Sequence, residues 1–511
     1  MIRRAEANVG DSRRETLLWR AFARSVRANV LAEMVSQAIR VGGFVYLARA
    51  LAASDFGVLR ILIAVTQLAG IISTTGIADA LIQREQINEE HEVAAWWANL
   101  GIAATSALAL YAATPWLAHL MAMPALAGPL RLLCLPLFVD GAASISNARL
   151  RRRLAFKVLV KAEVAAEVAF LLTALIVLFA GLPRWSLAGG LAARLATRGV
   201  VTWILERYVP RGAPRLSAIR DLYGFSLTVW GGRFLFTLSA NFDYMLIGRL
   251  LGSTVLGYYG MAWDLLRFIP ERLANVAGRV TLPAFARLQN DDEALQRAYC
   301  NFSGLLARIV FPIIAFAAVT APQLVVGLYG EHWLPAALPL RLLSFGLALV
   351  GVRLAIGSIY YAKSRPSYDI WLHGLRLVLI TLAVSSTASL GLVAVSAAMS
   401  IVEAAVSIVA QVMVCALIRL RAGSLLRAWW PGCRAAIPCM IGALTATRIA
   451  AAYGLTGAWA LAMAALPAAA IFLWLQFEAV GSVPFGLLDA DEAAEPEQAA
   501  GSTVLPSQGE A

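Results

Sequence analysis

Residues 390–416 read LGLVAVSAAMSIVEAAVSIVAQVMVCA, and Glu403 is the only charged residue among them. A helix needs about 20 mostly apolar residues to cross the hydrocarbon core of a bilayer, and this run is longer than that. The run also lacks the alternation of apolar and polar positions that marks a strand of a membrane β-barrel. The segment therefore predicts a transmembrane α-helix.

The composition of the whole chain extends this prediction. Of its 511 residues, 60% are hydrophobic and only 14% are charged, and the mean hydropathy is +0.71. Soluble domains contain about 45–50% apolar and about 25% charged residues. A water-soluble fold of this size cannot bury so much apolar surface, and a disordered chain is excluded by the same numbers. A polytopic membrane protein remains.

Apolar segments of helical length recur along the chain. Because backbone groups in lipid must be paired within the protein, long apolar runs are helices. We expect an all-α polytopic membrane protein with about 14 transmembrane helices and no soluble domain in the short connections. The expected helices are 29–50, 57–80, 93–115, 128–148, 159–181, 185–205, 222–246, 255–278, 303–325, 338–362, 369–388, 390–416, 433–452 and 457–477.

The charges of the connections predict the orientation. The chain has 43 Lys and Arg against 31 Asp and Glu, a net charge of +12. The basic residues of the connections lie almost entirely in the even-numbered ones, such as 149–161 and 207–220, and Arg184 is the clear exception. Basic connections are retained on the cytoplasmic side, so we expect both termini in the cytoplasm and no nucleic-acid partner. Residues 1–28 form a basic amphipathic segment, and 478–511 an acidic, disordered tail.

The rarer residues exclude several kinds of site. The five cysteines form no CxxC pair and the four histidines form no HExxH motif, so no metal site or disulfide framework is expected. None of the three lysines follows a glycine, which excludes a phosphate-binding loop. We therefore expect no cofactor, no catalytic residue and no ATPase site in this chain. Energy for transport has to come from an ion gradient, the substrate gradient or another subunit.

Two short motifs occur twice. LARALAASDFG at 47–57 parallels IGRLLGSTVLG at 247–257, an offset of 200, and PLRLL occurs at 129–133 and again at 339–343. This order predicts an N-lobe of helices 1–6 (29–205) and a C-lobe of helices 7–12 (222–416), with helices 13 and 14 (433–477) outside the repeat. Because six is an even number, both lobes enter the membrane in the same orientation. Transporters with this arrangement have a substrate path between two lobes that rock against each other.

Polar side chains share one face on each of four expected helices. Because intramembrane charges are functional candidates, these faces predict a hydrated cavity between the lobes. The stripes are Glu33, Gln37 and Arg40 on helix 1; Arg60, Gln67 and Thr74 on helix 2; Arg233, Thr237 and Asn241 on helix 7; and Asp264, Arg267 and Glu271 on helix 8.

Guanidinium groups bind phosphate through two parallel hydrogen bonds, so the cationic residues predict an anionic cargo. The substrate-binding candidates are Arg40, Arg60, Arg233, Arg267 and Arg353, and the ion-coupling candidates are Asp264, Glu271 and Glu33. Other interpretations stay open at this point. Asp264 with Arg267, and Arg267 with Glu271, can form internal ion pairs that only satisfy each other. Glu33, Arg60 and Arg233 can lie near helix ends and extend to the interface. Glu163, Glu167 and Glu403 can form hydrogen bonds between helices.

Several segments together resemble a known family. They are LARALAASDFGVLRILIAVTQLAGIISTTGIADALIQREQ (47–86), NARLRRRLAFK (147–157), NFDYMLIGRLLGSTVLGYYGMAWDLLRFIPERLANVAGRVTLPAFARLQND (241–291) and GEHWLPAALPLRLL (330–343). From about residue 16 to 420 the chain is similar to Wzx-type oligosaccharide flippases of the multidrug/oligosaccharidyl-lipid/polysaccharide exporter superfamily. One departure is the mixture of acidic and basic residues on helix 8.

The resemblance implies a transporter, not an enzyme. It implies that the protein moves polyprenyl-diphosphate-linked oligosaccharide units across the bacterial inner membrane for exopolysaccharide, capsule or O-antigen synthesis. The implied partners are this lipid-linked substrate, membrane lipids, a coupling proton or Na⁺, a polysaccharide polymerase and a chain-length regulator.

Two alternatives are weighed against it. Membrane oligosaccharide polymerases and ligases generally carry a large external loop. In this chain the longest expected external connections, 115–128 and 325–338, are short. A drug or cation antiporter of the same superfamily favours an acidic cavity, whereas the mid-helix charges here are mostly positive.

Overall fold

The computed structural model describes residues 37–74, 77–78, 81, 87–153, 155–212, 214, 216–455 and 457–480, without the side chains of 74, 156, 216–229, 269, 275–277, 279 and 474–480. Glu33, the basic segment 1–28 and most of the tail 478–511 lie outside these residues. The described part of the chain is helical with short connections, and it contains no strand. The predicted all-α polytopic class is therefore confirmed.

The helices overlap the expected segments in order. After a helix over 37–50, the first half contains α2 (Ala53–Thr74), α4 (Glu89–Leu120), α5 (Ala127–Ala142), α6 (Ser144–Arg152), α7 (Phe156–Phe179) and α8 (Pro183–Leu205). The second half contains α9 (Leu216–Arg287), α10 (Asp292–Val319), α11 (Ala321–Tyr329), α12 (Ala337–Val352), α13 (Ile356–Ala362), α14 (Ser367–Thr387) and α15 (Leu392–Leu417), followed by α16 (Ala422–Ala452) and α17 (Gly457–Val480).

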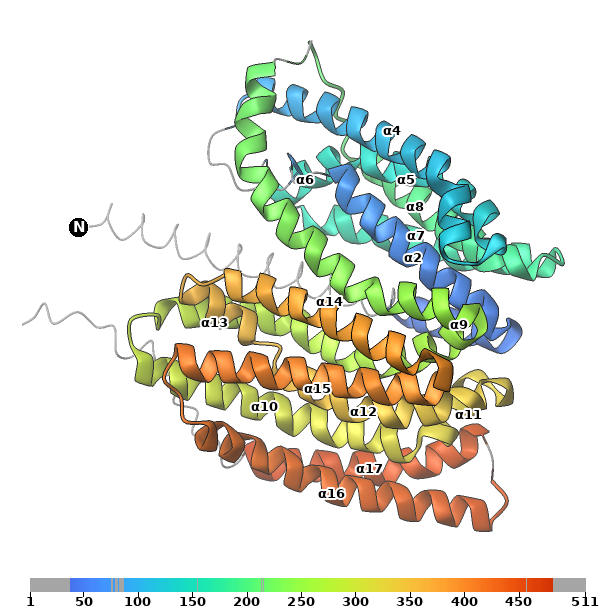
Figure 1. The fold of residues 1–511 in the computed structure, drawn as a ribbon, viewed down its shortest axis with the longest axis vertical. Helices are drawn as coiled ribbons and strands as arrows, with labels where there is room; N and C mark the ends of the chain where they lie inside the picture. The colour runs from blue at the N-terminus through green and yellow to red at the C-terminus, as the bar shows by residue number, and fades with distance from the viewer. Residues whose placement is uncertain are drawn as a thin grey trace, which may run out of the picture.

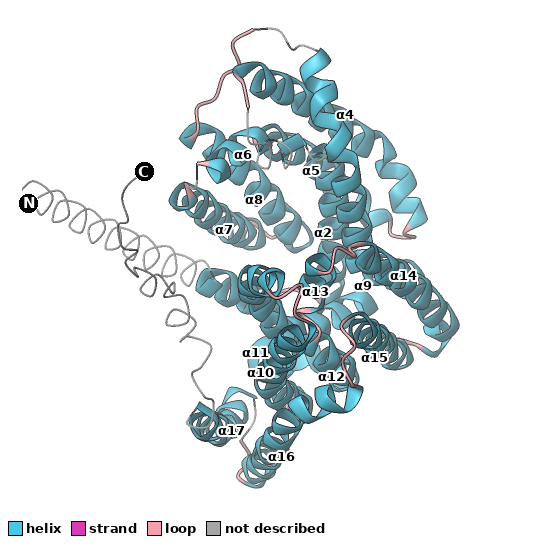
Figure 2. Cartoon of the chain, turned by 90° about the vertical axis from the view of Figure 1, so that its left-hand side faces the viewer, coloured by secondary structure: helices cyan, strands magenta, loops and turns pink. Residues whose placement is uncertain are grey.

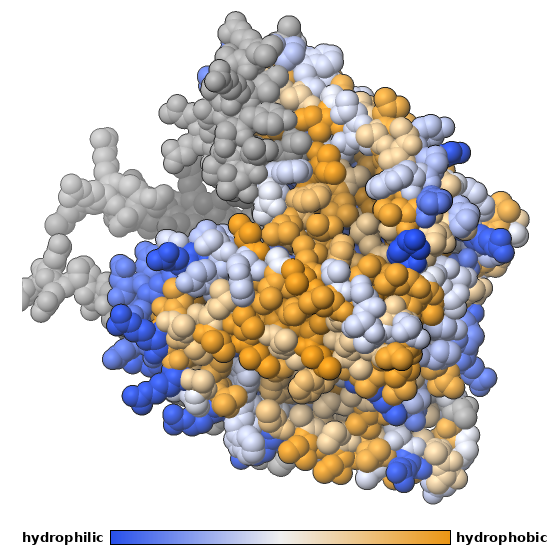
Figure 3. Space-filling view, viewed as in Figure 1, coloured by the Kyte–Doolittle hydropathy of each residue, from blue (hydrophilic) through white to orange (hydrophobic). Residues whose placement is uncertain are grey.

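Length and composition allow membrane crossing for many of these helices. Within the described ranges, nine helical segments are long and apolar enough to span a bilayer. The number of fourteen crossings stays a prediction. Figure 3 shows apolar side chains over the middle of the lower helices and hydrophilic side chains at their left edge. We name this left edge the basic end, because Lys363 and Arg419 lie in its connections.

Two expected helices are broken, and the breaks recur with the repeat. Expected helix 128–148 is divided into α5 and α6 at Ala143, and expected helix 338–362 is divided into α12 and α13 from Arg353. These positions differ by 210, the same offset as the PLRLL motif. Conversely, expected helices 7 and 8 form one element, α9, which bends at Gly252 with φ 86°. Only glycine adopts this φ readily, so the connection needs no loop.

The helices gather in two groups. Figure 1 shows α2 and α4–α8 above and α10–α17 below, and Figure 2 shows the same separation from the side. Within the first group α7 and α5 pack on α8, and within the second α10 packs on α12 and α16. We assign α9 to the second group, and its most extensive contact is with α2 of the first. This grouping supports our proposal of two lobes over 29–205 and 222–416.

The two copies of the first repeat motif meet each other. A Cβ at Gly57 would overlap the carbonyl oxygen of Ser253, and a Cβ at Gly257 would overlap the carbonyl oxygen of Ala53. The crossing is reciprocal under the 200-residue offset, and only glycine allows the two backbones to approach so closely. We name this end of the molecule the closed end.

Further contacts join the groups at the closed end. Arg49 donates from Nε to the carbonyl oxygen of Leu328 at 2.8 Å and from Nη2 to that of Gly327 at 2.5 Å. The indole of Trp333 donates to the carbonyl oxygen of Ala48 at 2.7 Å, and its side chain is fully buried. The closed end is therefore a packed core of both groups.

Candidate functional site

Four charged side chains form a cluster in the first half, which we name the N-half cluster. Arg40 comes from the helix over 37–50, Glu163 and Glu167 lie one turn apart on α7, and Arg194 comes from α8. Oε1 of Glu167 lies 2.5 Å from Arg40 Nη2 and 2.9 Å from Arg194 Nη2, and its side chain is 2% exposed. Oε1 of Glu163 lies 3.1 Å from Arg194 Nη2. The two carboxylates therefore compensate two guanidinium groups.

The N-half cluster borders two cavities. Arg40, Glu167 and Arg194 line a pocket of about 140 Å³, together with Arg60 from α2. Glu163 lines a larger cavity of about 290 Å³ between α2, α5, α6, α7, α8 and α9. On α2 this larger cavity begins at Gly70, thirteen residues from the crossing glycine and therefore about 20 Å away from the closed end.

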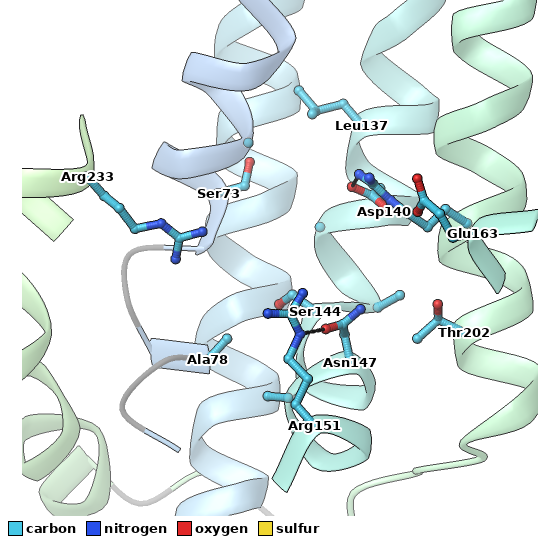
Figure 4. A pocket seen from close by; sticks show the side chains of 15 residues that line it. Ser73, Ala78, Leu137, Asp140, Ser144, Asn147, Arg151, Glu163, Thr202 and Arg233 are labelled. Atoms are coloured by element: carbon cyan, nitrogen blue, oxygen red, sulfur yellow. Dashed lines mark hydrogen bonds and ion pairs between the residues drawn. The ribbon is translucent and has the colours of Figure 1, made fainter. Parts of the chain in front are cut away.

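The larger cavity is lined by charged and polar groups (Figure 4). Arg198 binds both oxygens of Asp140, at 2.7 and 2.5 Å, and Arg151 donates to Asn147 Oδ1 at 2.7 Å. Figure 4 shows Arg233 extending from α9 into the same space. Amide, carboxylate and guanidinium groups can together bind sugar hydroxyls and phosphate oxygens. Hydroxyl groups are supplied by Ser73, Ser144 and Thr202.

Contacts on the opposite face of α6 position the cavity residues. Asn147 and Arg151 share the face toward the cavity, while Arg149 lies on another face and binds Glu206 Oε1 at 2.9 Å as well as Glu92. The guanidinium of Arg149 also lies 4.2 Å from the ring centre of Tyr208. Burial and the carboxylate of Glu92 raise the pKa of Tyr208 to about 12, against the influence of Arg149, so the phenol stays protonated.

An ion pair joins the two helix groups near the smaller pocket. Arg60 of α2 pairs with Asp264 of α9, and the guanidinium lies 5.7 Å from the ring centre of Tyr244. Gly260 lies against the aliphatic part of Arg60, at a position 200 residues later in the repeat. The sequence interpretation in which Asp264 pairs with Arg267 is therefore corrected: Arg267 pairs with Glu271, at 2.8 Å on the surface of α9.

The second half contains a buried counterpart, which we name the C-half cluster. Arg376 of α14 donates from Nε to Glu403 Oε1 of α15 at 2.7 Å, and Arg353 lies 3.4 Å from Glu403 Oε2. Arg376 also donates to the carbonyl oxygen of Ser239 on α9. The Glu403 side chain is 2% exposed, so this carboxylate depends on its two guanidinium partners.

The two clusters occupy equivalent positions with reversed charge. Glu167 and Arg194 precede Arg376 and Glu403 by the same 209 residues. In both halves the ion pair joins the two helices that the repeat makes equivalent, α7 with α8 and α14 with α15. The sequence analysis missed Arg376, although an arginine in the middle of an apolar helix, at the repeat position of Glu167, was a signal that could have found it.

Asp243 is a second residue that the sequence analysis missed. It lies on α9 with no exposed surface, and the Tyr259 hydroxyl donates to its Oδ2 at 3.0 Å. Its Oδ1 has no hydrogen-bond partner within the described residues. The available signal was an acidic residue in the NFDYMLIGR motif. A buried carboxylate with an unused oxygen can accept a proton or a cation more readily than a paired one.

The predicted site residues therefore do not all line one cavity. Arg40 and Arg60 line the smaller pocket, and Arg233 lines the larger one. Arg353 belongs to the buried C-half cluster, and Arg267 lies on α9 beside Glu271. Glu33 is outside the described residues. Whether these side chains bind a substrate or a coupling ion stays a prediction. Within the described ranges, His, Cys, Asp and Glu form no group of three that could hold a metal ion.

A family model described as "Polysaccharide biosynthesis protein" matches residues 46–338, more than half of the chain. The chain belongs to this family. The match covers the closed end, the larger cavity and three of the four residues of the N-half cluster, whereas Arg40 precedes it. The resemblance to Wzx-type proteins is confirmed by a relative of that type, lipopolysaccharide biosynthesis protein WzxC of Escherichia coli (strain K12), which is 26% identical over 326 residues, or 62% of this chain and 65% of WzxC.

Other relatives carry related names. Teichuronic acid biosynthesis protein TuaB of Bacillus subtilis (strain 168) is 25% identical over 311 residues, 59% of this chain and 62% of TuaB. Succinoglycan biosynthesis transport protein ExoT of Rhizobium meliloti (strain 1021) is 26% identical over 324 residues, 61% of this chain and 64% of ExoT. The matches to these three relatives span less than two thirds of each relative's length.

The fold is shared with solved transporters. Lipid II flippase MurJ in an inward closed conformation superposes with a TM-score of 0.69 at 12% identity, over 91% of this chain and 99% of MurJ. A multidrug resistance MATE family transporter of the MOP superfamily, in an inward-facing conformation, has a TM-score of 0.62 at 16% identity, over 76% of this chain and 96% of that chain. At these identities the likeness concerns the fold.

Proposed function

We propose that this protein is a flippase that moves a polyprenyl-diphosphate-linked oligosaccharide unit across the bacterial inner membrane, for exopolysaccharide, capsule or O-antigen synthesis. The observation that carries the proposal is the placement of the larger cavity. It is lined by arginine, carboxylate and amide side chains, and it lies about 20 Å along α2 from the closed end. The names of TuaB and ExoT, and the fold shared with a lipid II flippase, point to the same activity.

The paired arginines keep unused donors for an anionic headgroup. A guanidinium offers five N–H groups, and Nε of Arg40 has no partner within the described residues. We expect the diphosphate to accept from Arg40 and Arg60 at the smaller pocket, and the sugars to occupy the larger cavity beside Arg151 and Arg233. Glu167 holds the guanidinium of Arg40, and Asp264 that of Arg60, before the cargo arrives, which lowers the cost of ordering them.

Transport requires the two helix groups to separate at one end of the molecule and to come together at the other. In this proposal the structure is an inward-facing state in which both termini are cytoplasmic. Outward opening separates the α2–α9 crossing at Gly57 and Gly257 and closes the cavity at the other end. Asp264, Glu271 and Glu33 are the candidates for coupling to a proton or Na⁺, and the buried carboxylate of Asp243 joins them. A polysaccharide polymerase and a chain-length regulator are the proposed partners.

The first experiment replaces Arg40 and Arg60, the two arginines proposed to bind the diphosphate at the smaller pocket, by alanine. We expect the double variant to insert at normal abundance but to lose glycan export, measured as surface polysaccharide and as lipid-linked units accumulating in the inner leaflet. Lysine at both positions should restore export only in part, because an ammonium does not bind phosphate with two parallel bonds. The control is Arg297→Ala, since this arginine is largely exposed on α10. Unimpaired export in the double variant would remove both residues from the mechanism.

The same assay separates the alternatives. If the protein were a polymerase or ligase, the substitutions would change the chain length of the surface glycan without trapping lipid-linked units in the inner leaflet. If the protein were a drug antiporter, the substitutions would change the sensitivity of the cells to cationic compounds and leave the surface polysaccharide unchanged. The arginines that line the two cavities favour an anionic cargo over a cationic one.

A further inference from the structure

A second site lies on the other half of the molecule. A groove of about 620 Å³ runs between α12, α15 and α16, a size typical of small-molecule sites. Its walls are mostly apolar, with Leu349, Leu425 and Trp429 inside and the exposed side chains of Ile408 and Val412 at its rim. It shares no lining residue with the two cavities of the N-half, and Figure 2 shows α12, α15 and α16 in the group away from α5–α8.

Two buried polar groups in this apolar groove lack partners. Ser407 and Gln411 lie one turn apart on α15 and line the groove, with 1% and 7% exposure. The hydroxyl of Tyr299 donates to Gln411 Oε1 at 2.6 Å, which fixes the amide so that Nε2 points away from Tyr299. Neither Gln411 Nε2 nor Ser407 Oγ has a hydrogen-bond partner within the described residues. Because an unpaired buried donor is costly, an occupant with acceptor oxygens would stabilise this groove.

The groove ends in positive charge. Arg419 lines its end in the turn that follows α15, where its backbone has a φ of 55°. Gln296 donates to the carbonyl oxygens of Ile418 and Arg419, at 2.8 and 3.4 Å, and so holds this turn in place. α16 begins three residues later with Arg421 as its N-cap, and the positive end of its dipole faces the same region. This connection between α15 and α16 belongs to the basic end of the molecule.

We propose that the groove between α12, α15 and α16 binds one anionic phospholipid of the surrounding bilayer. The acyl chains lie between Leu349, Leu425 and Trp429, and the phosphate lies at Arg419. An ester carbonyl accepts from Gln411 Nε2. An occupant of this groove needs an apolar part, acceptor oxygens and a negative headgroup. A phosphatidylglycerol molecule supplies these as its acyl chains, its ester carbonyls and its phosphate. The carrier lipid of the cargo is the less favoured occupant, because none of the groove residues borders the proposed cargo site.

The experiment is native mass spectrometry of the full-length protein in detergent, titrated with phosphatidylglycerol or phosphatidylethanolamine. We expect one phosphatidylglycerol to bind at least tenfold more tightly than phosphatidylethanolamine. Arg419→Ala should weaken phosphatidylglycerol binding about tenfold, as expected for loss of a charge-assisted hydrogen bond. Ala416→Trp fills the groove from its wall and should abolish the tight site.

Matched variants keep the test sharp. Ile313→Trp introduces the same ring into a different apolar groove, of about 270 Å³ between α10, α16 and α17, and should leave phosphatidylglycerol binding unchanged. Gln411→Leu combined with Tyr299→Phe removes the donor without leaving an unpaired phenol, and should weaken both phospholipids several-fold. Equal affinity for the two phospholipids, or binding that survives both Arg419→Ala and Ala416→Trp, overturns the proposal. So does selective binding of undecaprenyl phosphate at this groove in place of phosphatidylglycerol. The assay involves no cargo movement, so its result does not depend on the flippase proposal.

Discussion

The reciprocal glycine crossing at the closed end is the most direct point at which to test the proposed conformational change. In Gly57→Ala the new methyl group would overlap the carbonyl oxygen of Ser253. Backbone atoms cannot rotate away as a side chain can, so α2 and α9 must separate. Inserting one methyl group into a close-packed contact costs about 1–3 kcal/mol. Because about 1.4 kcal/mol corresponds to a tenfold change, the open population at this end should rise about 5- to 150-fold.

The readout is the accessibility of a cysteine beneath the crossing. Ala48 has no exposed surface in the closed end, and its carbonyl oxygen accepts from Trp333. The background requires replacement of the five native cysteines, of which Cys433 is exposed. In cells carrying Ala48→Cys, Gly57→Ala should increase the rate of labelling by a membrane-impermeant thiol reagent by the factor estimated above.

The control lies on the same helix. At Gly70 no atom lies within 4 Å of the position that an added Cβ would occupy, so Gly70→Ala should leave the labelling rate unchanged. Gly257→Ala introduces the equivalent overlap from the other helix. The double variant with Gly57→Ala should be labelled only slightly faster than either single variant, because one separation of the helices relieves both overlaps. A folded Gly57→Ala protein that labels at the parental rate would refute the role of this crossing as the external closure.

The remaining predictions concern the charged clusters. Arg376→Ala leaves the buried Glu403 with only the longer contact to Arg353, so we expect a loss of about 3–5 kcal/mol in unfolding free energy, measured by denaturation in detergent, and a parental value in this variant would contradict the buried pairing. Reversing the pair, Arg376→Glu with Glu403→Arg, should recover part of that loss, because the N-half cluster already holds the reversed order at the same repeat positions. Arg198→Lys removes the two-bond contact with Asp140, and glycan export should fall about tenfold at normal protein abundance, whereas full export would show that the larger cavity tolerates a point charge there. Asp243→Asn keeps an acceptor for Tyr259 but cannot take up a proton, so export should lose its dependence on the proton gradient if this carboxylate couples transport, and retained dependence would exclude it.

Local pattern was enough to predict the fold class, because lipid demands long apolar helices and each such run is visible without its neighbours. The helices of the structure overlap the expected segments for the same reason. The 200-residue offset also located Gly57 and Gly257 in equivalent motifs. What no single segment contains is the pairing of charges across helices. Asp264 lies three residues before Arg267 in the chain, yet it pairs with Arg60 from another helix group.

The packing of the helices also determines which charges are available for cargo. Arg353 and Arg40 have similar surroundings in the sequence, but Arg353 joins a buried cluster and Arg40 lines a pocket. The partners of Arg376, which are Glu403 on α15 and the carbonyl oxygen of Ser239 on α9, meet it only when α9, α14 and α15 are brought together. An ion pair depends on a few ångströms between atoms far apart in the chain, whereas hydrophobicity is a property of each segment. The sequence alone therefore predicts that this chain crosses the membrane, and the arrangement of its helices sets where a phosphate or a lipid can bind.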